Sequence, residues 1–202
     1  MDSLDQLTGS DIAHCLRNAA PNHQEPRIIT DAHYREASVL VPFIRIDQAW
    51  HILFIRRSHC TGDRHSGQVA FAGGKREPSD IDAIATALRE AHEEIGVAPH
   101  DVKILGQMAH HYSYVSHFRI TPIVGTFNWP YPTQPDPREV QRIFSIPLTW
   151  LANRENYGTQ ARDLNGVSVP VVYFKEYDGE LLWGATARMV VSLLDILKQQ
   201  NS

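Results

Sequence analysis

Three glutamates close together in the chain are the residues most able to do chemistry. Glu90, Glu93 and Glu94 lie within REAHEEIG, at spacings that bring side chains together on a helix, and Arg89 stands one turn before Glu93 and can pair with it. Carboxylates about 6 Å apart repel by about 3 kcal/mol per pair at an effective dielectric of about 20, but by less than about 1 kcal/mol in bulk water. On a solvated helix face the cluster therefore needs no explanation, whereas in a cleft it needs a cation. Mg²⁺ or Mn²⁺ would suit, because both take oxygen ligands and leave positions open for phosphate oxygens of an ester or pyrophosphate.

The glycine-rich segment that precedes the glutamates favours a position of these glutamates in a cleft. Gly73 and Gly74 precede the glutamates, and without a Cβ their backbone can turn sharply against a ligand. Lys75 and Arg76 follow directly and could offer positive charge to an anion. A glycine loop, two basic residues and a Glu-rich helix face together form a much rarer combination than any one of them.

We expect the glutamates to lie on a helix that runs from about Asp80 to Ile95. Ser79 and Asp82 form a candidate capping box, and Gly96 suits the C′ position. An apolar stripe at helical spacing should face the core, and its members are Ile84, Leu88, Ala91 and Ile95. The three glutamates fall on the opposite side of this helix.

Composition predicts one folded domain. The 202 residues are 43% hydrophobic, and 19 basic residues against 23 acidic ones give a net charge of −4, which argues against salt-driven nucleic-acid binding over the whole surface. The N-terminal MDSLDQLTGSD lacks the basic and apolar pattern of a targeting signal, and the apolar stretch LLWGATARMVVSLLDIL is interrupted by Arg188 and Asp195. Cys15 and Cys60 form no motif, so no disulfide is expected. We expect a cytoplasmic protein with neither a nucleic-acid nor a membrane partner.

The order of elements predicts a mixed α/β domain. Two β-rich runs, residues 37–46 and 50–57, are separated by the short DQA and predict an antiparallel pair. Further strand-like runs cover residues 102–108, 120–127 and 169–177. Helices are expected near both ends, the first with Ser10 as N-cap and the last beginning near Thr186.

The glycine loop and the Glu-rich segment together resemble the signature of the Nudix hydrolases. That signature ends in Arg-Glu, an apolar residue, any residue, Glu-Glu, any residue, glycine and an apolar residue, and residues 89–97 match it throughout. Its first half differs, because Asp80 stands where the family has glutamate and one extra residue precedes Arg89. This spacing, together with HSGQVAFAGGK and the upstream Arg57-Ser58, is similar to the coenzyme A pyrophosphatase branch. The resemblance covers roughly residues 35 to 197.

The resemblance implies an α/β (α+β) Nudix fold, a mixed β-sheet in an α/β/α sandwich, over residues 35–202. Residues 1–34 would be an N-terminal helical extension of the same domain. The implied reaction is Mg²⁺- or Mn²⁺-dependent hydrolysis of a nucleoside diphosphate derivative, foremost coenzyme A or acyl-coenzyme A to phosphopantetheine and 3′,5′-ADP. ADP-ribose or a dinucleoside polyphosphate is the alternative substrate, and a non-catalytic Nudix-fold binding module is the alternative from another class. Homodimer formation stays open.

The resemblance also implies roles by position. The implied metal ligands are Glu90, Glu93, Glu94 and the carbonyl of Gly74. Arg89 would orient Glu93, which could instead position a water. Glu139, in DPREV, would act as base or extra ligand, or else be an ordinary surface charge. The expected substrate contacts are Arg57, Arg64, Gly73 and Lys75.

Overall fold

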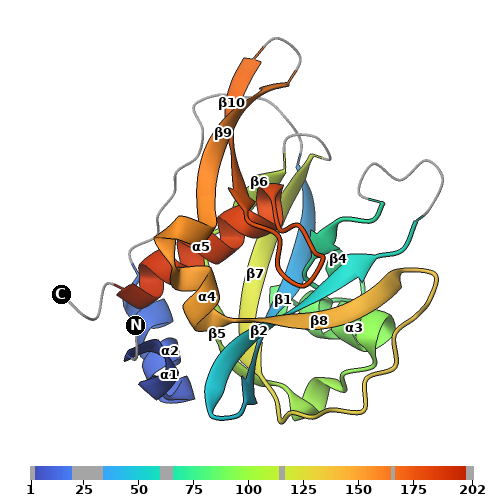
Figure 1. The fold of residues 1–202 in the computed structure, drawn as a ribbon. Helices are drawn as coiled ribbons and strands as arrows, with labels where there is room; N and C mark the ends of the chain where they lie inside the picture. The colour runs from blue at the N-terminus through green and yellow to red at the C-terminus, as the bar shows by residue number, and fades with distance from the viewer. Residues whose placement is uncertain (1–2, 20–33, 60–65, 114–116, 165–166, 199–202) are drawn as a thin grey trace.

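A mixed sheet of eight strands forms the centre of the protein (Figure 1). The computed structural model describes residues 3–19, 34–59, 66–113, 117–164 and 167–198. The strands of this sheet are β1 Arg35–Ile46, β2 Ala49–Arg57, β3 Val69–Ala70, β4 Gly73–Lys75, β5 Lys103–Gln107, β6 His111–Ser113, β7 Phe118–Thr126 and β8 Val140–Pro147. The main path runs β3-β2-β1-β7-β5, while β4 pairs with β1, β6 with β7 and β8 with β2. Since β1 and β7 are parallel and the other pairs antiparallel, the predicted mixed sheet is confirmed.

The first two strands form the predicted antiparallel hairpin. Phe43 lies opposite Ile52, and the turn residues Asp47 and Gln48 have φ values of 48° and 67°. Positive φ at both central residues is the geometry that matches a two-residue turn to the right-handed twist of its strands, and aspartate tolerates it better than most residues. The two buried strands are thereby held in one register.

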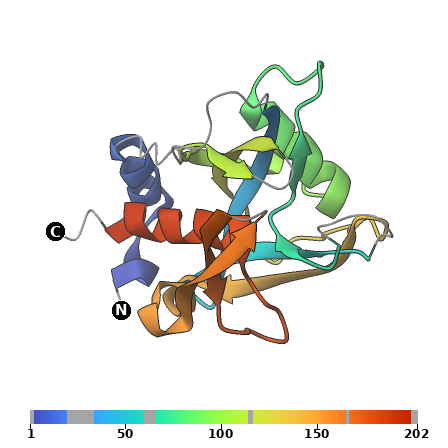
Figure 2. The same ribbon diagram turned by 90° about the horizontal axis from the view of Figure 1, so that it is seen from above.

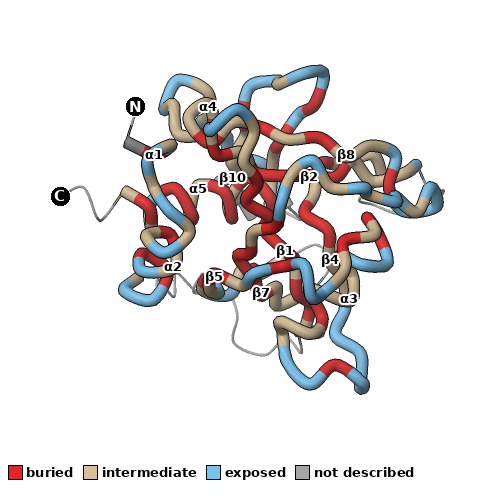
Figure 3. The backbone as a smooth tube through the Cα atoms, turned by 90° about the horizontal axis from the view of Figure 1, so that it is seen from below, coloured by how far each residue is buried: buried red, intermediate tan, exposed pale blue. Residues whose placement is uncertain are grey.

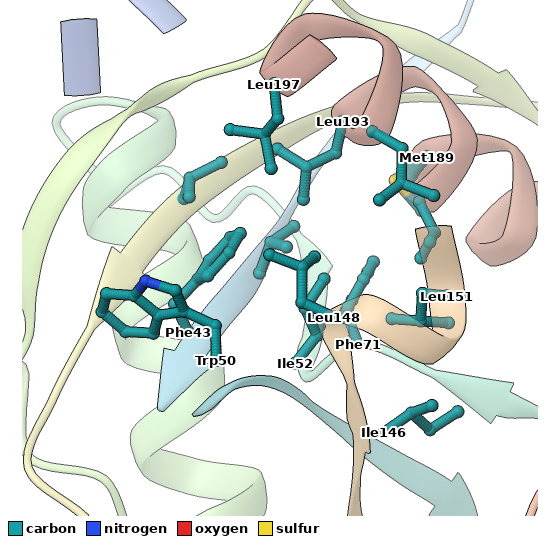
Figure 4. Close-up of a cluster of buried hydrophobic side chains, with 14 of the residues drawn as sticks. Phe43, Trp50, Ile52, Phe71, Ile146, Leu148, Leu151, Met189, Leu193 and Leu197 are labelled. Atoms are coloured by element: carbon teal, nitrogen blue, oxygen red, sulfur yellow. The ribbon is translucent and has the colours of Figure 1, made fainter. Parts of the chain in front are cut away.

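Helices cover both faces of the sheet (Figure 2). They are α1 Ser3–Gln6, α2 Gly9–Asn18, α3 Ala83–Ile95, α4 Leu148–Ala152 and α5 Gly184–Lys198, with short 3₁₀ turns η1 Pro99–Asp101 and η2 Arg154–Asn156. Strand β1 alternates between two cores, because Leu40 and Ile44 pack with α3 whereas Val41 and Phe43 pack with α2 and α5. Figure 3 shows the buried centre of the sheet, and Figure 4 shows the core beneath α5, where Phe43 lies near Trp50. Burying one such side chain contributes about 1.5–3 kcal/mol.

The N-terminal helices dock on the β1–β2 hairpin. The N-cap of α2 is Thr8, which forms a reciprocal capping box with Asp11, so the assignment to Ser10 was wrong. The indole of Trp50 donates a 2.7 Å hydrogen bond to the carbonyl oxygen of Leu7. Because Leu4 and Ile12 are also buried in the α5-side core, this segment forms part of the same core as the sheet.

A second, two-stranded sheet extends from the body at the top of Figure 1. Strands β9 Tyr157–Leu164 and β10 Val167–Phe174 pair antiparallel. The apolar run at 169–177 predicted β10, whereas the polar partner strand carried no apolar pattern and was missed.

Helix α5 begins at Gly184, two residues before the expected start. Among the described helices, none has the length and apolarity needed to span a bilayer.

Candidate active site

Glu94 is buried, which corrects the expectation that it lies on the outer side of α3. Only 2% of its side chain is exposed; its carboxylate accepts a 2.9 Å hydrogen bond from the backbone N–H of Gly73 and lies 3.7 Å from the guanidinium of Arg57. Burial raises the pKa of Glu94 to about 8, although Gly73 and Arg57 both oppose the rise. The buried face of α3 is centred nearer Ala87 and Ala91 than the apolar stripe indicated, because the helix turns toward the glycine loop.

Gly74 and Glu90 approach each other so closely that any side chain at position 74 would displace the Glu90 carboxylate. A Cβ there would lie 2.6 Å from the Glu90 carboxylate. Gly73 is more constrained, because a Cβ there would lie 2.4 Å from the backbone carbonyl oxygen of Ser38, which cannot move away as a side chain can. The two glycines and Lys75 form β4, which pairs with β1, and α3 packs against this strand, where the glycines carry no side chains. Burial raises the pKa of Glu90, and its contact with Arg89 opposes that rise.

Arg89 holds the loop to the helix. Its guanidinium contacts the carboxylates of Asp80, Glu90 and Glu93 at 3.0, 2.9 and 3.0 Å, and it also donates to the carbonyl oxygen of Lys75 at 3.0 Å. The predicted pairing of Arg89 with Glu93 is confirmed. The pairing with Asp80 was not predicted, and it lowers the pKa of Asp80 to about 2.

The helix is shorter at its N-terminus than predicted. Asp82 is the N-cap and its side chain accepts a hydrogen bond from the backbone N–H of Ala85, so α3 begins at Ala83 and the capping box at Ser79 was wrong. The residue that would have begun the helix, Asp80, instead turns inward. Gly96 ends α3 with φ of 74°, as predicted, and a Cβ there would meet the backbone nitrogen of Gln134 at 2.8 Å.

Glu139 comes near the two buried glutamates although it is about 45 residues away in the chain. Its negative charge contributes to the raised pKa values of both Glu90 and Glu94. The backbone holds it there, because its carbonyl oxygen accepts a 2.8 Å hydrogen bond from the N–H of Ser58 and the next residue pairs with Arg57. Strand pairing between β2 and β8 thus brings Glu139 beside Arg57, and Arg57 in turn contacts Glu94 of α3.

The remaining expected contacts have mixed outcomes. Lys75 is exposed on β4 beside the glycines, while Arg64 falls outside the described residues. Arg76, expected to offer its charge to an anion, pairs with Glu36 at 2.8 Å and donates to two backbone carbonyls at the start of α3. Its charge is therefore already compensated within the protein.

The chemistry of this donor set fits a hard divalent cation. Burial raises the pKa values of Glu90 and Glu94, and the charge of the exposed Glu139 adds to both rises, so the negative forms of these carboxylates would be stabilised by a cation. Oxygen ligands are those that Mg²⁺ and Mn²⁺ prefer. Within the described ranges no three acidic, histidine or cysteine side chains already form a metal-coordinating group, and Arg89 contacts Glu90 and Glu93 instead.

Comparison with known proteins agrees with this geometry. Residues 34–165 match the family described as the NUDIX domain. The chain is 35% identical over 172 residues to proteins described as uncharacterized Nudix hydrolase NudL from Yersinia pestis and Yersinia pseudotuberculosis, covering 83% of this chain and 84% of each relative. Among solved structures, a MutT/nudix family protein from Enterococcus faecalis superposes with a TM-score of 0.55 at 11% identity, covering 96% of this chain and 75% of that one. A MutT protein from Methanosarcina mazei Go1 gives 0.52 at 16% identity, covering 86% and 99%.

Proposed function

The chain belongs to the Nudix hydrolase family, and from this premise we propose that its substrate is coenzyme A, free or acylated. Nudix enzymes hydrolyse nucleoside diphosphate derivatives with the help of divalent cations, and this chain is a pyrophosphohydrolase of that kind. The proposed reaction cuts the phosphoanhydride of coenzyme A and releases phosphopantetheine and 3′,5′-ADP.

The observation that carries the proposal is the convergence of Glu90, Glu94 and Glu139 at the glycine loop. We propose Glu90, Glu93, Glu94 and the Gly74 carbonyl as the metal ligands, with Mg²⁺ or Mn²⁺ as the ion. The bound ion supplies a Lewis acid that neutralises the pyrophosphate and makes an attacking water more acidic. Glu139 is our candidate for the base that takes the water's proton, and its electrostatic effect on both Glu90 and Glu94 supports this choice.

The other side chains would bind and orient. Arg57 already lies beside Glu94, so its guanidinium is placed to hold a phosphate oxygen of the substrate. Gly73 and Lys75 would contact the pyrophosphate from the loop. The backbone of Gly73 can come close because it carries no side chain, and Lys75 would supply a positive charge. Arg89 acts through Glu93 and the loop, because its four contacts set where those groups lie.

The choice of coenzyme A rests on the loop sequence. The stretch from His65 to Lys75 and the acidic residue at position 80 are similar to the coenzyme A pyrophosphatase branch. The geometry supports reading that acidic residue as part of the machinery, because Asp80 is 7% exposed and binds Arg89 through two hydrogen bonds. Aspartate at position 80, where the general signature has glutamate, therefore still provides a carboxylate that pairs with Arg89.

A parallel substrate test decides among the alternatives. The protein is incubated with Mg²⁺ or Mn²⁺ and coenzyme A, ADP-ribose or a dinucleoside polyphosphate, and products are identified by mass. We expect 3′,5′-ADP from coenzyme A, with turnover lost in Glu90→Gln at unchanged thermal stability. Selective cleavage of ADP-ribose would overturn the substrate assignment. Binding without hydrolysis of any of the three would favour a non-catalytic module.

A further inference from the structure

Arg188 is a half-buried arginine with no acidic partner among the described residues. It lies in the second turn of α5, and no hydrogen bond or ion pair joins its guanidinium to any side chain or carbonyl within the described ranges. Arg56, Arg89 and Arg142, in contrast, each contact a carboxylate. The guanidinium nitrogens of Arg188 are not among the fully buried atoms, so they combine a charge that no described acidic residue compensates with access from solvent, which is what binding of an external anion requires.

The register of the sheet shows where Arg188 lies relative to the glycine loop. His111 pairs with Ile120, Ile120 with Ala37, and Ala37 with Lys75, so these four residues form a row across β6, β7, β1 and β4. Cross-strand partners share a face, and Ile120 packs in the core beneath α5, so the row lies on the α5 face.

Arg188 stands at the far end of that row. Helix α5 packs beside β6, and the charge of Arg188 is close enough to lower the pKa of His111, which burial already lowers to about 4. The ends of the row are separated by three strand spacings, or about 14 Å. Lys75, at the near end, adjoins the glycine that touches Glu90. A phosphate held at the carboxylates therefore cannot also be the anion that Arg188 binds.

We propose that Arg188 binds a phosphomonoester of the substrate that is remote from the scissile phosphoanhydride. This inference rests on the proposed function, under which that group is the 3′-phosphate of coenzyme A. A guanidinium suits it, because the planar fork of N–H donors can bind two phosphate oxygens at once. His111, kept neutral by its surroundings, adds a hydrogen-bonding group without a competing charge. Apolar Ala37 and Ile120 lie between the two phosphate positions in the row across the strands.

The test compares coenzyme A with 3′-dephospho-coenzyme A as substrates. In the wild type we expect kcat/KM to favour coenzyme A by about 10- to 100-fold, the effect of one hydrogen-bonded charge pair. Arg188→Gln should bring this ratio to about 1 by lowering only the value for coenzyme A, and Arg188→Lys should keep part of it. Arg17→Gln, at an exposed arginine near the end of α2, is the matched control and should behave as wild type. Equal use of both substrates by the wild type, or an unchanged ratio in Arg188→Gln, would overturn the inference.

A binding measurement separates this inference from the substrate assignment. Calorimetry compares 3′,5′-ADP with 5′-AMP on the same four proteins, with thermal unfolding as a check on folding. If coenzyme A is not hydrolysed but 3′,5′-ADP binds more tightly than 5′-AMP in an Arg188-dependent way, the substrate proposal fails and the phosphomonoester site stands. If the two nucleotides bind equally to the wild type, the site itself is refuted.

Discussion

The guanidinium of Arg89 binds the carboxylate of Asp80 through two hydrogen bonds, each 3.0 Å long. This pair joins the loop after β4 to the middle of α3, and the same guanidinium reaches Glu90 and Glu93. The loop cannot shift without moving the residues proposed to bind the cation. Asp80, which departs from the general family signature, is therefore linked through Arg89 to the glutamates of the candidate site.

Replacing Asp80 should weaken both stability and activity. Asp80→Asn keeps the shape but removes the charge that Arg89 binds, so we expect kcat/KM for coenzyme A to fall by about 10-fold or more. The pKa of Asp80 is lowered to about 2, so its contribution to stability is fully present above pH 3.8 and is lost as pH falls through the folded value. We expect a loss of about 1–2 kcal/mol at pH 7, allowing for solvent screening, measured by urea unfolding. Glu155→Gln, at an exposed acid, is the control, and equal effects of the two substitutions would contradict the assignment.

Adding a methyl group at Gly74 should impair catalysis more than folding. The new Cβ in Gly74→Ala would lie 2.6 Å from the Glu90 carboxylate, which is the mobile end of a side chain and can move away. We expect turnover to fall by about 100-fold, as for a misplaced catalytic group, while the free energy of unfolding changes by less than about 1 kcal/mol. Gly158→Ala, where no atom lies within 4 Å, should leave both unchanged. Full activity in Gly74→Ala would show that the position of Glu90 is unimportant.

Stabilisation by a divalent cation should depend on Glu94. In the wild type, millimolar Mn²⁺ should raise the melting temperature, because an ion that binds the native state shifts the unfolding equilibrium, and EDTA should reverse the rise. Glu94→Gln retains an acceptor for the Gly73 N–H but removes the charge, so the shift and the turnover should both disappear. Glu176→Gln, an exposed substitution, serves as control. A full Mn²⁺ shift in Glu94→Gln would remove Glu94 from the ligand set.

His111 should contribute a loss of stability in mildly acidic solution, which opposes the contribution of Glu94, whose pKa is raised to about 8 and whose effect has the opposite sign. Burial, Arg188 and His110 lower the pKa of His111 to about 4, so between about pH 6.5 and pH 4 the unfolded chain binds a proton that the folded chain excludes. Its stabilising effect is therefore present above pH 6.5 and falls as pH decreases, by at most about 3 kcal/mol. Urea unfolding at pH 7, 6 and 5 should show that the pH slope of the wild type differs from that of His111→Asn by this contribution, because the substitution leaves the opposing effect of Glu94 in place. His100→Gln, at a histidine whose side chain is 83% exposed, should leave the slope unchanged.

Local spacing was enough to predict the elements and one contact of the candidate site. The strand pair around Asp47, the helix ending at Gly96 and the pairing of Arg89 with Glu93 all depend on residues a few positions apart. Turn chemistry, capping and the helical repeat act over that range, and side chains four apart on a helix meet wherever the helix packs.

Burial and long-range pairing could not be obtained in this way. Helical periodicity placed Glu94 beside the other glutamates, but only the packing of α3 on the glycine strand showed that it is enclosed. Glu139 comes near Arg57 because β8 pairs with β2, and the charge of Arg188 acts on His111 because α5 packs beside β6. The sequence alone therefore determined which chemical groups are present and how they are ordered locally. The distances between helices and strands determine which charged groups lie in water and which must be paired. Those distances exist only in the folded chain.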